Sequence, residues 1–326
     1  MRAVWYDRQG PAEDVLNFGE LPDPLPGPGE VRVRIRFSGV NPGDTKKRRG
    51  WLGSEMPYQR VIPHSDGAGV IDAVGDVVDS ARIGRRVWVF GAQSYRPFGT
   101  AGEMTVVPEG QAIDLPDEVP DEIGACLGIP GITAHRAVFV DGAVAGKTVL
   151  VHGALGGVGS FAAQLAHWAG ATVIGTVRKR DDLDQINSDA VTHAVALGES
   201  GVVDTIRTYA PDGVDHIVEV AFSDNIDLDA AVANNGTSIA AYATRADRPS
   251  FPFWPMLFDN ITIHLLGSDD FPATAKQEAA KDLTAAAQQG ALAITVDTPL
   301  PLERTAEAHD RVDAGGRARV LVDVKG

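Results

Sequence analysis

The sequence predicts a two-domain α/β protein, in which a small, mostly antiparallel β-barrel is followed by a doubly wound parallel sheet. Before Pro120, short strands of alternating polarity are separated by turns rich in glycine and proline, and helix is scarce. After it, short continuous apolar strands alternate with amphipathic helices. The 326 residues, 44% hydrophobic and 22% charged, are enough for two globular domains and exclude a disordered or fibrous chain.

The barrel prediction depends on strands of period two. Residues 30–38 (EVRVRIRFS) alternate apolar and charged side chains, as a half-buried strand does. The preceding residues 22–29 contain four prolines and cannot form a helix. Further apolar runs at 69–74 and 86–90 are separated by turn residues, so a compact antiparallel arrangement is expected.

The parallel sheet is predicted from alternating strand and helix patterns. Residues 148–152 (TVLVH) form a short apolar run of the kind buried on both faces of a sheet, and residues 158–169 form an amphipathic helix. Further strands are expected at 172–176, 192–196, 216–220, 238–242 and 261–266, with helices at 122–127, 133–140, 181–187, 202–210 and 275–289. A closing strand at 319–324 returns to the first domain. We therefore assign residues 1–120 and 270–326 to the barrel domain and residues 121–269 to the parallel-sheet domain.

Charge and cysteine content narrow the function classes. The net charge of −15 repels phosphate backbones and anionic lipid, so neither nucleic acid nor a membrane is an expected partner. Cys126 is the only cysteine, which excludes an internal disulfide and any zinc site built from several thiolates. Because no apolar leader or membrane-spanning run is visible, a cytoplasmic protein is the simplest expectation.

A glycine-rich loop carries the strongest functional signal. The segment His152-Gly153-Ala154-Leu155-Gly156-Gly157-Val158-Gly159 lies directly after a buried strand and directly before a helix. Ala154 stands where a dinucleotide fingerprint has its first glycine, Gly156 allows close approach of a pyrophosphate, and Gly159 allows close packing of the helix. The helix N-terminus, with the N–H groups of Gly157 and Val158, favours phosphate. This loop predicts dinucleotide binding.

The second strand of the parallel sheet predicts which dinucleotide is bound. NAD-binding proteins place an acidic residue at the end of this strand, where it accepts hydrogen bonds from the ribose. This chain instead has Arg178, Lys179 and Arg180, and a guanidinium can hold a 2'-phosphate with two hydrogen bonds. NADPH is therefore the expected cofactor. The alternative is a solvated basic turn that balances the aspartates over 181–184.

The ordered set of motifs resembles the medium-chain dehydrogenase/reductase superfamily, and within it the zinc-free quinone oxidoreductase, or zeta-crystallin-like, branch. The matching segments span essentially the whole chain: 39–44 (GVNPGD), 62–69 (IPHSDGAG), 98–103 (FGTAGE), 131–134 (GITA) and 149–164. The resemblance implies that residues 1–120 and 270–326 form a catalytic GroES-like domain and that residues 121–269 form an NADPH-binding Rossmann domain. It also implies an NADPH-dependent quinone oxidoreductase that forms homodimers.

The resemblance further implies that no metal is used. Zinc-dependent relatives carry a cysteine where this chain has Asn41, and a His-Glu pair where it has Ser65-Asp66. His64 stands alone in sequence and is assigned a structural role. One departure concerns the cofactor. The lysine and tyrosine that relatives often place near the 2'-phosphate are replaced here by residues 182–183 and Leu197, so the NADPH prediction depends on residues 178–180.

Site roles follow from the resemblance. Asn41 and Thr133 would lie beside the nicotinamide, and the backbone of Gly267 and Ser268 would contact its carboxamide. Without a metal, the expected reaction is direct hydride transfer from NADPH to a quinone or another conjugated acceptor, in which the protein mainly positions the reactants. The hydroxyl of Tyr95 could donate to the acceptor oxygen as negative charge develops there.

Several alternatives remain open at this stage. Tyr95 could be an ordinary exposed loop tyrosine, and Asn41 could belong to a turn in which Asp44 caps a helix over 45–49. An enoyl or alkenal double-bond reductase would use the same parts on α,β-unsaturated carbonyls. A non-enzymatic, crystallin-like NADPH-binding protein would keep the loop without turnover.

Two segments bear on self-association. Residues 260–266 (NITIHLL) alternate polar and apolar side chains and are expected to form a sheet edge that pairs with a second copy, although the edge could be shielded within the monomer. The apolar run 251–258 (FPFWPMLF) fits either a place near the cleft and the subunit contact or simple core packing.

Overall fold

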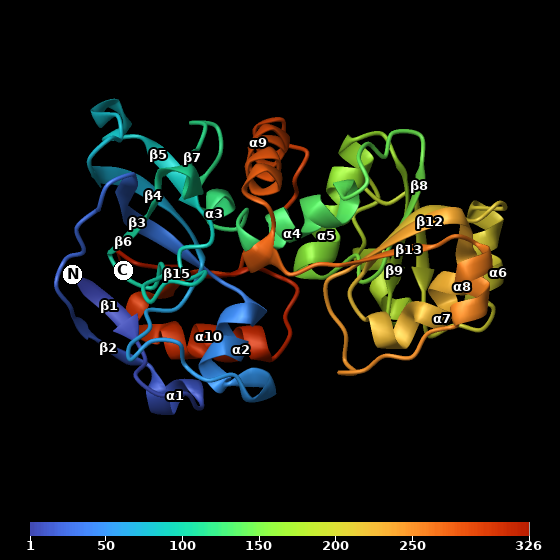
Figure 1. Ribbon diagram of the computed structural model, residues 1–326, viewed down its shortest axis with the longest axis horizontal. Coiled ribbons are helices and arrows are strands. Elements are labelled where there is room, and N and C mark those ends of the chain that lie inside the picture. The colour runs from blue at the N-terminus through green and yellow to red at the C-terminus, as the bar shows by residue number, and fades with distance from the viewer. Residues whose placement is uncertain (326) are drawn as a thin grey trace. The chain divides into compact units, whose positions relative to one another are not determined.

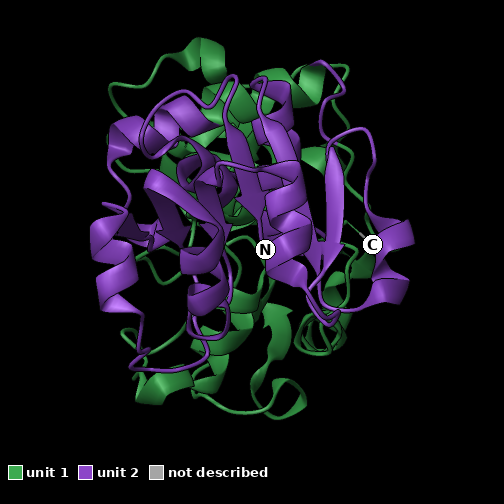
Figure 2. Cartoon of the chain, turned by 90° about the vertical axis from the view of Figure 1, so that its right-hand side faces the viewer, with its two compact units in different colours: residues 1–130, 280–288, 293–326 green, residues 131–279, 289–292 purple. Residues whose placement is uncertain are grey.

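The computed structural model describes residues 1–325, which divide into two compact units (Figure 2). Unit 1 contains Met1–Pro130, Ala280–Gln288 and the C-terminal segment from Ala293. Unit 2 contains Gly131–Ala279 and Gln289–Leu292. The two sequence-predicted domain types, an antiparallel barrel and a parallel sheet, are both found.

Unit 1 is built mainly from strands joined by turns and short helices (Figure 1). Its strands are β1 (Arg2–Trp5), β2 (Asn17–Glu20), β3 (Glu30–Val40), β4 (Asp66–Val74), β5 (Arg86–Val89), β6 (Met104–Pro108), β7 (Ala112–Asp114), β14 (Leu300–Pro301) and β15 (Val320–Asp323). Its helices are α1 (Ala12–Val15), α2 (Pro42–Arg49), α3 (Asp121–Gly124) and α10 (Thr305–Asp313), with 3-10 turns η1 (Trp51–Gly53), η2 (Ser80–Arg82), η3 (Glu109–Gln111) and η6 (Leu302–Arg304).

The long strand β3 organises the sheet of unit 1. The described strands run in the order β14-β15-β3-β4-β5-β7, and β6 also pairs with β3. All of these pairs are antiparallel except β14 with β15. The register that places Val320 opposite Val40 confirms the expected return of the last strand to the first domain. Inward-facing residues such as Val33 and Ile35 form the core.

Trp88 on β5 joins the sheet of unit 1 to a late helix. Its ring is fully buried, and its Nε1 donates to Oγ1 of Thr284 at 3.0 Å. Thr284 belongs to α9 (Ala273–Gln288), whose last residues lie in unit 1. A buried indole N–H needs such an acceptor, so this hydrogen bond fixes the end of α9 on the sheet.

Unit 2 is a doubly wound sheet. Its strands are β8 (Thr148–Val151), β9 (Thr172–Val177), β10 (His193–Ala196), β11 (Val214–Glu219), β12 (Ala233–Ala241) and β13 (Thr262–Leu265). Its helices are α4 (Ile129–Phe139), α5 (Gly157–Trp168), α6 (Val202–Tyr209), α7 (Phe222–Val232) and α8 (Phe253–Phe258), with turns η4 (Arg180–Gln185) and η5 (Ser268–Asp270). All described pairs are parallel, in the order β10-β9-β8-β11-β12-β13. Ligands bind such sheets beyond the carboxyl ends of the strands, where the strand order reverses.

Two expectations about elements in unit 2 need correction. The helix expected over 181–187 is the 3-10 turn η4, because aspartate-rich sequence without a capping side chain favours tight turns over α-helix. Core packing does not explain the run 251–258, since only Met256 of its large side chains is buried and Phe253, Trp254 and Phe258 are exposed. Within residues 1–325, no helix combines the length and apolar character needed to cross a membrane.

Candidate functional site

The glycine loop of unit 2 joins β8 to α5. Gly153 has a φ of +67°, which glycine adopts without strain, and the next residue, Ala154, is buried. A Cβ on Gly159 would lie 2.2 Å from the carbonyl oxygen of Gly153, so a side chain there would displace the helix from the loop. Gly156 and Gly157, in contrast, are exposed. Gly159 therefore serves packing, while Gly156 and Gly157 leave the backbone open to a ligand.

The N-terminus of α5 offers unpaired donors at this loop. The first N–H to bond within the helix is that of Ser160, which donates to the carbonyl of Gly156 at 2.9 Å. The N–H groups of Gly157, Val158 and Gly159 precede it and have no partner within the helix. These donors and the helix dipole suit an anionic group such as a pyrophosphate. The residues present thus fit the phosphates of a dinucleotide.

The basic side chains predicted to hold the 2'-phosphate follow β9, the strand beside β8. Arg178, Lys179 and Arg180 are all exposed. Nη1 of Arg180 lies 3.3 Å from Oε2 of Glu199, in an ion pair that is itself exposed. No ion pair involves Arg178 or Lys179 among the described side chains. Since β8 and β9 are parallel neighbours, their carboxyl ends place the loop and the cations at one edge of the sheet.

A buried charged cluster lies behind the loop. His152, the last residue before Gly153, is fully buried, with Nδ1 3.0 Å from Oγ1 of Thr176 and Nε2 2.8 Å from Oδ1 of Asp229. Oε2 of Glu219 lies 3.6 Å from the same Nε2. Asp229 and Glu219 are also fully buried. His152 directly follows β8, and the other three side chains come from β9, α7 and β11, so the cluster joins these elements beneath the loop.

Burial and neighbouring charges shift the pKa values of this cluster in opposite directions. Burial by itself would lower the pKa of His152, but the charge and hydrogen bond of Asp229 and the charge of Glu219 raise it overall. Burial raises the pKa of Glu219 to about 7, although the positive charge of His152 opposes this shift. The arrangement places the imidazole ring of His152 between two carboxyl groups. His152, Glu219 and Asp229 each offer one atom that could bind a metal ion, and these atoms lie within 4.8 Å of one another. The 2.8 Å contact between His152 and Asp229, however, has the length of a charge-assisted hydrogen bond.

In unit 1, Asn41 is fixed by two buried contacts. It precedes α2 and is 3% exposed. Its Nδ2 donates to Oδ2 of Asp66 at 2.7 Å, and its Oδ1 accepts from Nη2 of Arg319 at 2.7 Å. Its backbone N–H donates to Oδ2 of Asp44 at 2.8 Å, so Asp44 helps to cap the helix from its third position, and the helix begins at Pro42 and not at residue 45. One amide hydrogen of Asn41 remains for another partner.

The pKa of the Asp66 carboxyl group is strongly shifted by its surroundings. Burial raises its pKa to about 7, the charge of Asp44 adds to the rise, and the contacts from Asn41, the Ile129 N–H and Arg319 oppose it. Oδ2 also accepts from Ile129 at 2.8 Å, whereas Oδ1 has no hydrogen-bond partner among residues 1–325. A side chain at position 128 would collide with this carboxyl group, which explains the glycine there.

The other candidate residues occupy varied surroundings. Thr133 is buried on α4. Tyr95, with a φ of +54°, is 69% exposed in the loop after β5, and its carbonyl accepts from the hydroxyl of Tyr58. Gly267 is exposed just beyond β13, and Ser268 begins η5. Gly267 and Ser268 therefore follow the same edge of the parallel sheet as the glycine loop.

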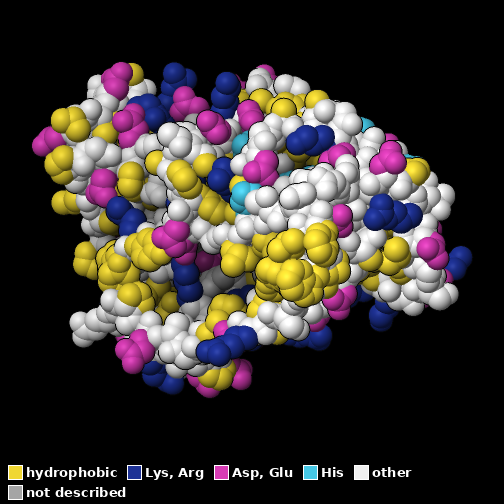
Figure 3. Space-filling view, turned by 45° about the vertical axis from the view of Figure 1, so that its right-hand side comes forward, with side chains coloured by type: hydrophobic (Ala, Val, Ile, Leu, Met, Phe, Trp, Pro, Cys, Tyr) yellow, Lys and Arg dark blue, Asp and Glu magenta, His cyan; other side chains and the backbone are white. Residues whose placement is uncertain are grey.

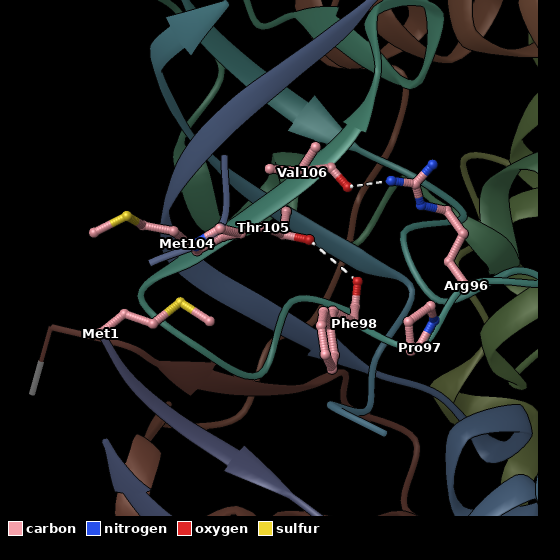
Figure 4. A pocket seen from close by; sticks show the side chains of 8 residues that line it. Met1, Arg96, Pro97, Phe98, Met104, Thr105 and Val106 are labelled. Atoms are coloured by element: carbon pink, nitrogen blue, oxygen red, sulfur yellow. Dashed lines mark hydrogen bonds between the residues drawn. The ribbon is translucent and has the colours of Figure 1, made fainter. Parts of the chain in front are cut away.

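A small pocket in unit 1 contains none of the candidate residues. Its volume is about 300 Å³, and the side chains drawn in Figure 4 line it. Its cation, Arg96, donates to Oε1 of Glu30 at 2.7 Å and to the carbonyl of Val106 at 3.1 Å. Because this guanidinium is already engaged, the pocket does not show the converging polar groups of a binding site.

The sequence did not reveal the residues that hold His152 and Asn41 in place. The buried run TVLVH signalled that His152 is enclosed, but nothing in the sequence paired it with Asp229 or Glu219, which lie 67 or more positions further along the chain. Arg319 was noted only as the start of a strand. Its contact with Asn41 spans 278 positions and could not be read from local pattern.

Comparison with known proteins identifies the family. Two family models match the chain, alcohol dehydrogenase GroES-like domain over residues 27–117 and zinc-binding dehydrogenase over residues 157–281. Human quinone oxidoreductase is 31% identical over 324 residues, which cover 98% of this chain and 95% of the human protein. The rat quinone oxidoreductase is 31% identical over 318 residues, covering 96% of this chain and 94% of the rat protein.

Solved structures show the same fold over the whole chain. An NAD-dependent alcohol dehydrogenase is 26% identical, with a TM-score of 0.87 over 99% of this chain and 100% of that one. A mycobacterial protein complexed with NADPH is 24% identical, with a TM-score of 0.83 over 99% of this chain and 100% of that one. Together with the relatives above, they confirm the resemblance seen in the motifs and the expected fold. The chain belongs to the quinone oxidoreductase family of the medium-chain dehydrogenase/reductase superfamily.

Proposed function

We propose that this protein is a zinc-independent, NADPH-dependent quinone oxidoreductase that transfers hydride directly to a quinone or a similar conjugated acceptor. The observation that carries the proposal is the open backbone of Gly156 and Gly157 at the N-terminus of α5, with exposed cations at the end of the neighbouring strand. The relatives named quinone oxidoreductase support the acceptor class.

The cofactor preference is proposed from the cations that follow β9. A 2'-phosphate carries negative charge that an acidic residue would repel and that Arg178 or Lys179 would attract. Arg180 is the weaker candidate of the three, because its guanidinium already pairs with Glu199. We therefore assign the phosphate contact to Arg178 and Lys179.

The protein's share of the chemistry is positioning. When bound, NADPH would supply the hydride, which with one proton reduces a quinone to its hydroquinone. The N–H groups of residues 157–159 would hold the pyrophosphate, and Thr133 with the backbone of Gly267 and Ser268 would hold the nicotinamide. Asn41 is proposed to lie beside the nicotinamide, where its remaining amide hydrogen would donate. Tyr95 is proposed as the donor to the acceptor oxygen.

Zinc independence is proposed from the donor groups around Asn41. An amide and a serine hydroxyl stand at the positions where zinc-dependent relatives are expected to carry thiolate and imidazole ligands. The nitrogens of His64 are already engaged, Nδ1 with Ser38 at 2.8 Å and Nε2 with His309 at 2.9 Å. Burial raises the pKa of the Cys126 thiol to about 11, which keeps it protonated. The residues present do not fit a catalytic zinc ion.

A homodimer is also proposed, through the outer edge of β13. In the described part of unit 2 this strand pairs only with β12, so its other side is an open sheet edge. An apolar patch precedes this strand in sequence, formed by the exposed side chains of Phe251, Phe253, Trp254, Leu257 and Phe258. Exposed hydrophobic side chains gather in this way on the face that Figure 3 draws. A second copy related by a two-fold axis would cover both the edge and the patch.

The function is tested by following reduced nicotinamide absorbance with purified protein, NADPH or NADH, and a panel of acceptors. We expect oxidation of NADPH with simple quinones, faster than with α,β-unsaturated ketones, aldehydes or enoyl thioesters. Faster turnover of the enones would identify a double-bond reductase instead. Tight NADPH binding without turnover of any acceptor would support the crystallin-like alternative.

Metal dependence is tested separately by elemental analysis and chelation. We expect less than stoichiometric zinc after dialysis and unchanged activity with a chelator. Stoichiometric zinc, together with activity that the chelator removes, would contradict the proposed zinc independence.

A further inference from the structure

Thr176, at the end of β9, holds the start of the glycine loop with two of its atoms. Its Oγ1 accepts from the N–H of Gly153 at 3.3 Å, and its carbonyl accepts from the N–H of Ala154 at 3.0 Å. The loop then closes with the N–H of Gly156 donating to the carbonyl of Gly153 at 2.8 Å. The direction in which the chain enters α5 therefore depends on where the Thr176 side chain stands.

The position of Thr176 is in turn set by His152. The imidazole Nδ1 lies 3.0 Å from the threonine hydroxyl, and Nε2 lies 2.8 Å from Asp229 on α7. Because both nitrogens are occupied, the ring cannot rotate without losing a buried hydrogen bond. His152 thus links the helix α7 to the residue that holds the loop.

The cluster is costly in a way that a purely structural contact need not be. Two carboxyl groups and an imidazole are removed from water here, and Oδ2 of Asp229 has no hydrogen-bond partner within the described chain. Apolar side chains of similar volume would often be as stable or more stable in such a place. Because the cluster lies directly behind the loop that offers the phosphate donors, its role is to hold that loop in place.

We propose that His152 is a positioning residue for dinucleotide binding. Through Thr176 it holds Gly153 and Ala154 so that the N–H groups at the start of α5 stay aimed at the pyrophosphate. This inference rests on the proposed cofactor function, and His152 itself touches no part of the cofactor. Loss of its contact with Thr176 should weaken the binding of any ligand that carries the pyrophosphate.

Two substitutions separate positioning from stability. In His152→Asn, the amide nitrogen comes close to the place of Nδ1 and can keep the contact with Thr176. In His152→Gln, it comes close to the place of Nε2 and can keep the contact with Asp229. Each variant loses one buried hydrogen bond, so similar losses of thermal stability are expected.

Thr176→Val removes the hydroxyl while preserving shape and serves as the second test. Ile206→Val, at the buried position of α6, is the matched control for lost stability.

The measurements are the dissociation constants of NADPH and of adenosine 2'-phosphate, which lacks the pyrophosphate, together with Tm. We expect His152→Gln and Thr176→Val to raise the NADPH constant about tenfold and to leave the adenosine 2'-phosphate constant unchanged. His152→Asn and Ile206→Val should change the NADPH constant less than twofold.

Equal NADPH constants for His152→Gln and Ile206→Val at similar Tm would overturn the inference, as would parallel weakening of both ligands. The wild-type protein tests the proposed function independently. If it binds NADH in place of NADPH, the comparison is made with NADH and adenosine. If it binds neither dinucleotide, the proposed function and this inference both fail.

Discussion

Nε2 of His64 lies 2.9 Å from Nε2 of His309, and both rings are buried in unit 1. One of these nitrogens must donate and the other accept. The Nε–H of Arg48 donates to Nδ1 of His309 at 3.2 Å, so His309 carries its proton on Nε2 and donates it to His64. His64 then carries its proton on Nδ1 and donates to the hydroxyl of Ser38 at 2.8 Å. Both histidines are therefore neutral, and each in one defined tautomer.

This histidine pair predicts acid sensitivity. Burial lowers the pKa of His64 to about 3, and burial with the positive charge of Arg48 and of a protonated His64 lowers that of His309 well below its usual value. A histidine with a depressed pKa stabilises the fold above its unfolded pKa of about 6.5, and this contribution is lost as the pH falls toward the folded pKa. The free energy of unfolding should therefore fall as the pH is lowered from 7 to 4.

The comparison variant is His64→Asn, whose amide can keep the bond to Ser38 but does not titrate. It should be less stable than the wild type at pH 7.5, by about 1–3 kcal/mol, because His309 loses its buried partner. Urea unfolding should show the two stabilities converging as the pH falls. Parallel curves for wild type and variant would contradict the assignment of neutral buried histidines.

Asp66 should titrate in the opposite sense. Because its pKa is raised to about 7, its contribution to stability is full below its unfolded value of about 3.9 and is lost as the pH rises through 7. In Asp66→Asn, the amide oxygen can still accept from Asn41 and Ile129, but no charge forms. From pH 5 to pH 8 the variant should gain at least about 1.4 kcal/mol of unfolding free energy relative to the wild type. A constant difference across this range, measured by urea unfolding, would argue against a raised pKa.

Arg178→Ala should reduce NADPH affinity selectively. A hydrogen bond to a charged group contributes about 1.5–3 kcal/mol, so the NADPH dissociation constant should rise about 10- to 100-fold while that of NADH stays within about twofold. Arg180→Ala is the matched control, since its guanidinium pairs with Glu199 and its loss should have a smaller effect. Both constants can be measured by protein fluorescence or calorimetry. Equal wild-type affinities for NADPH and NADH would contradict the proposed preference.

A proline at position 265 should dissociate the proposed dimer. The N–H of Leu266 donates to the carbonyl of Ala241 on β12, so the alternation of a strand turns the N–H of Leu265 outward. Leu265→Pro removes a donor from the open edge and leaves the pairing with β12 intact. Light scattering at micromolar concentration should show a dimer for the wild type and a monomer for this variant.

Leu265→Ala is the control for this variant, because it shortens the same exposed side chain but keeps the N–H. It should retain more of the dimer than Leu265→Pro does. A monomeric wild type would reject the dimer, and a dimer that survives Leu265→Pro would reject pairing through this edge.

Much of the fold was determined by local sequence. The period-two pattern over 30–38 and the apolar run over 148–152 each specify a strand from neighbouring residues, and the glycine loop identifies itself by lying between a strand and a helix. Helix boundaries were less well determined. The expected helix over 181–187 became a 3-10 turn, because aspartate-rich sequence has little intrinsic preference for the α-helix.

The tertiary structure alone decided the surroundings of the candidate residues. Asn41 was identified from the sequence, but its two side-chain hydrogen bonds are made with Asp66 and with Arg319, which lies 278 positions away. His152 was visible in the loop motif, yet the raised pKa of its imidazole depends on Asp229, which only the packing of α7 brings to it. Local sequence specifies backbone pattern because propensity and periodicity act between neighbours. Burial, ion pairing and the pKa shifts that follow from them depend on residues distant in sequence, and the fold is what brings those residues together.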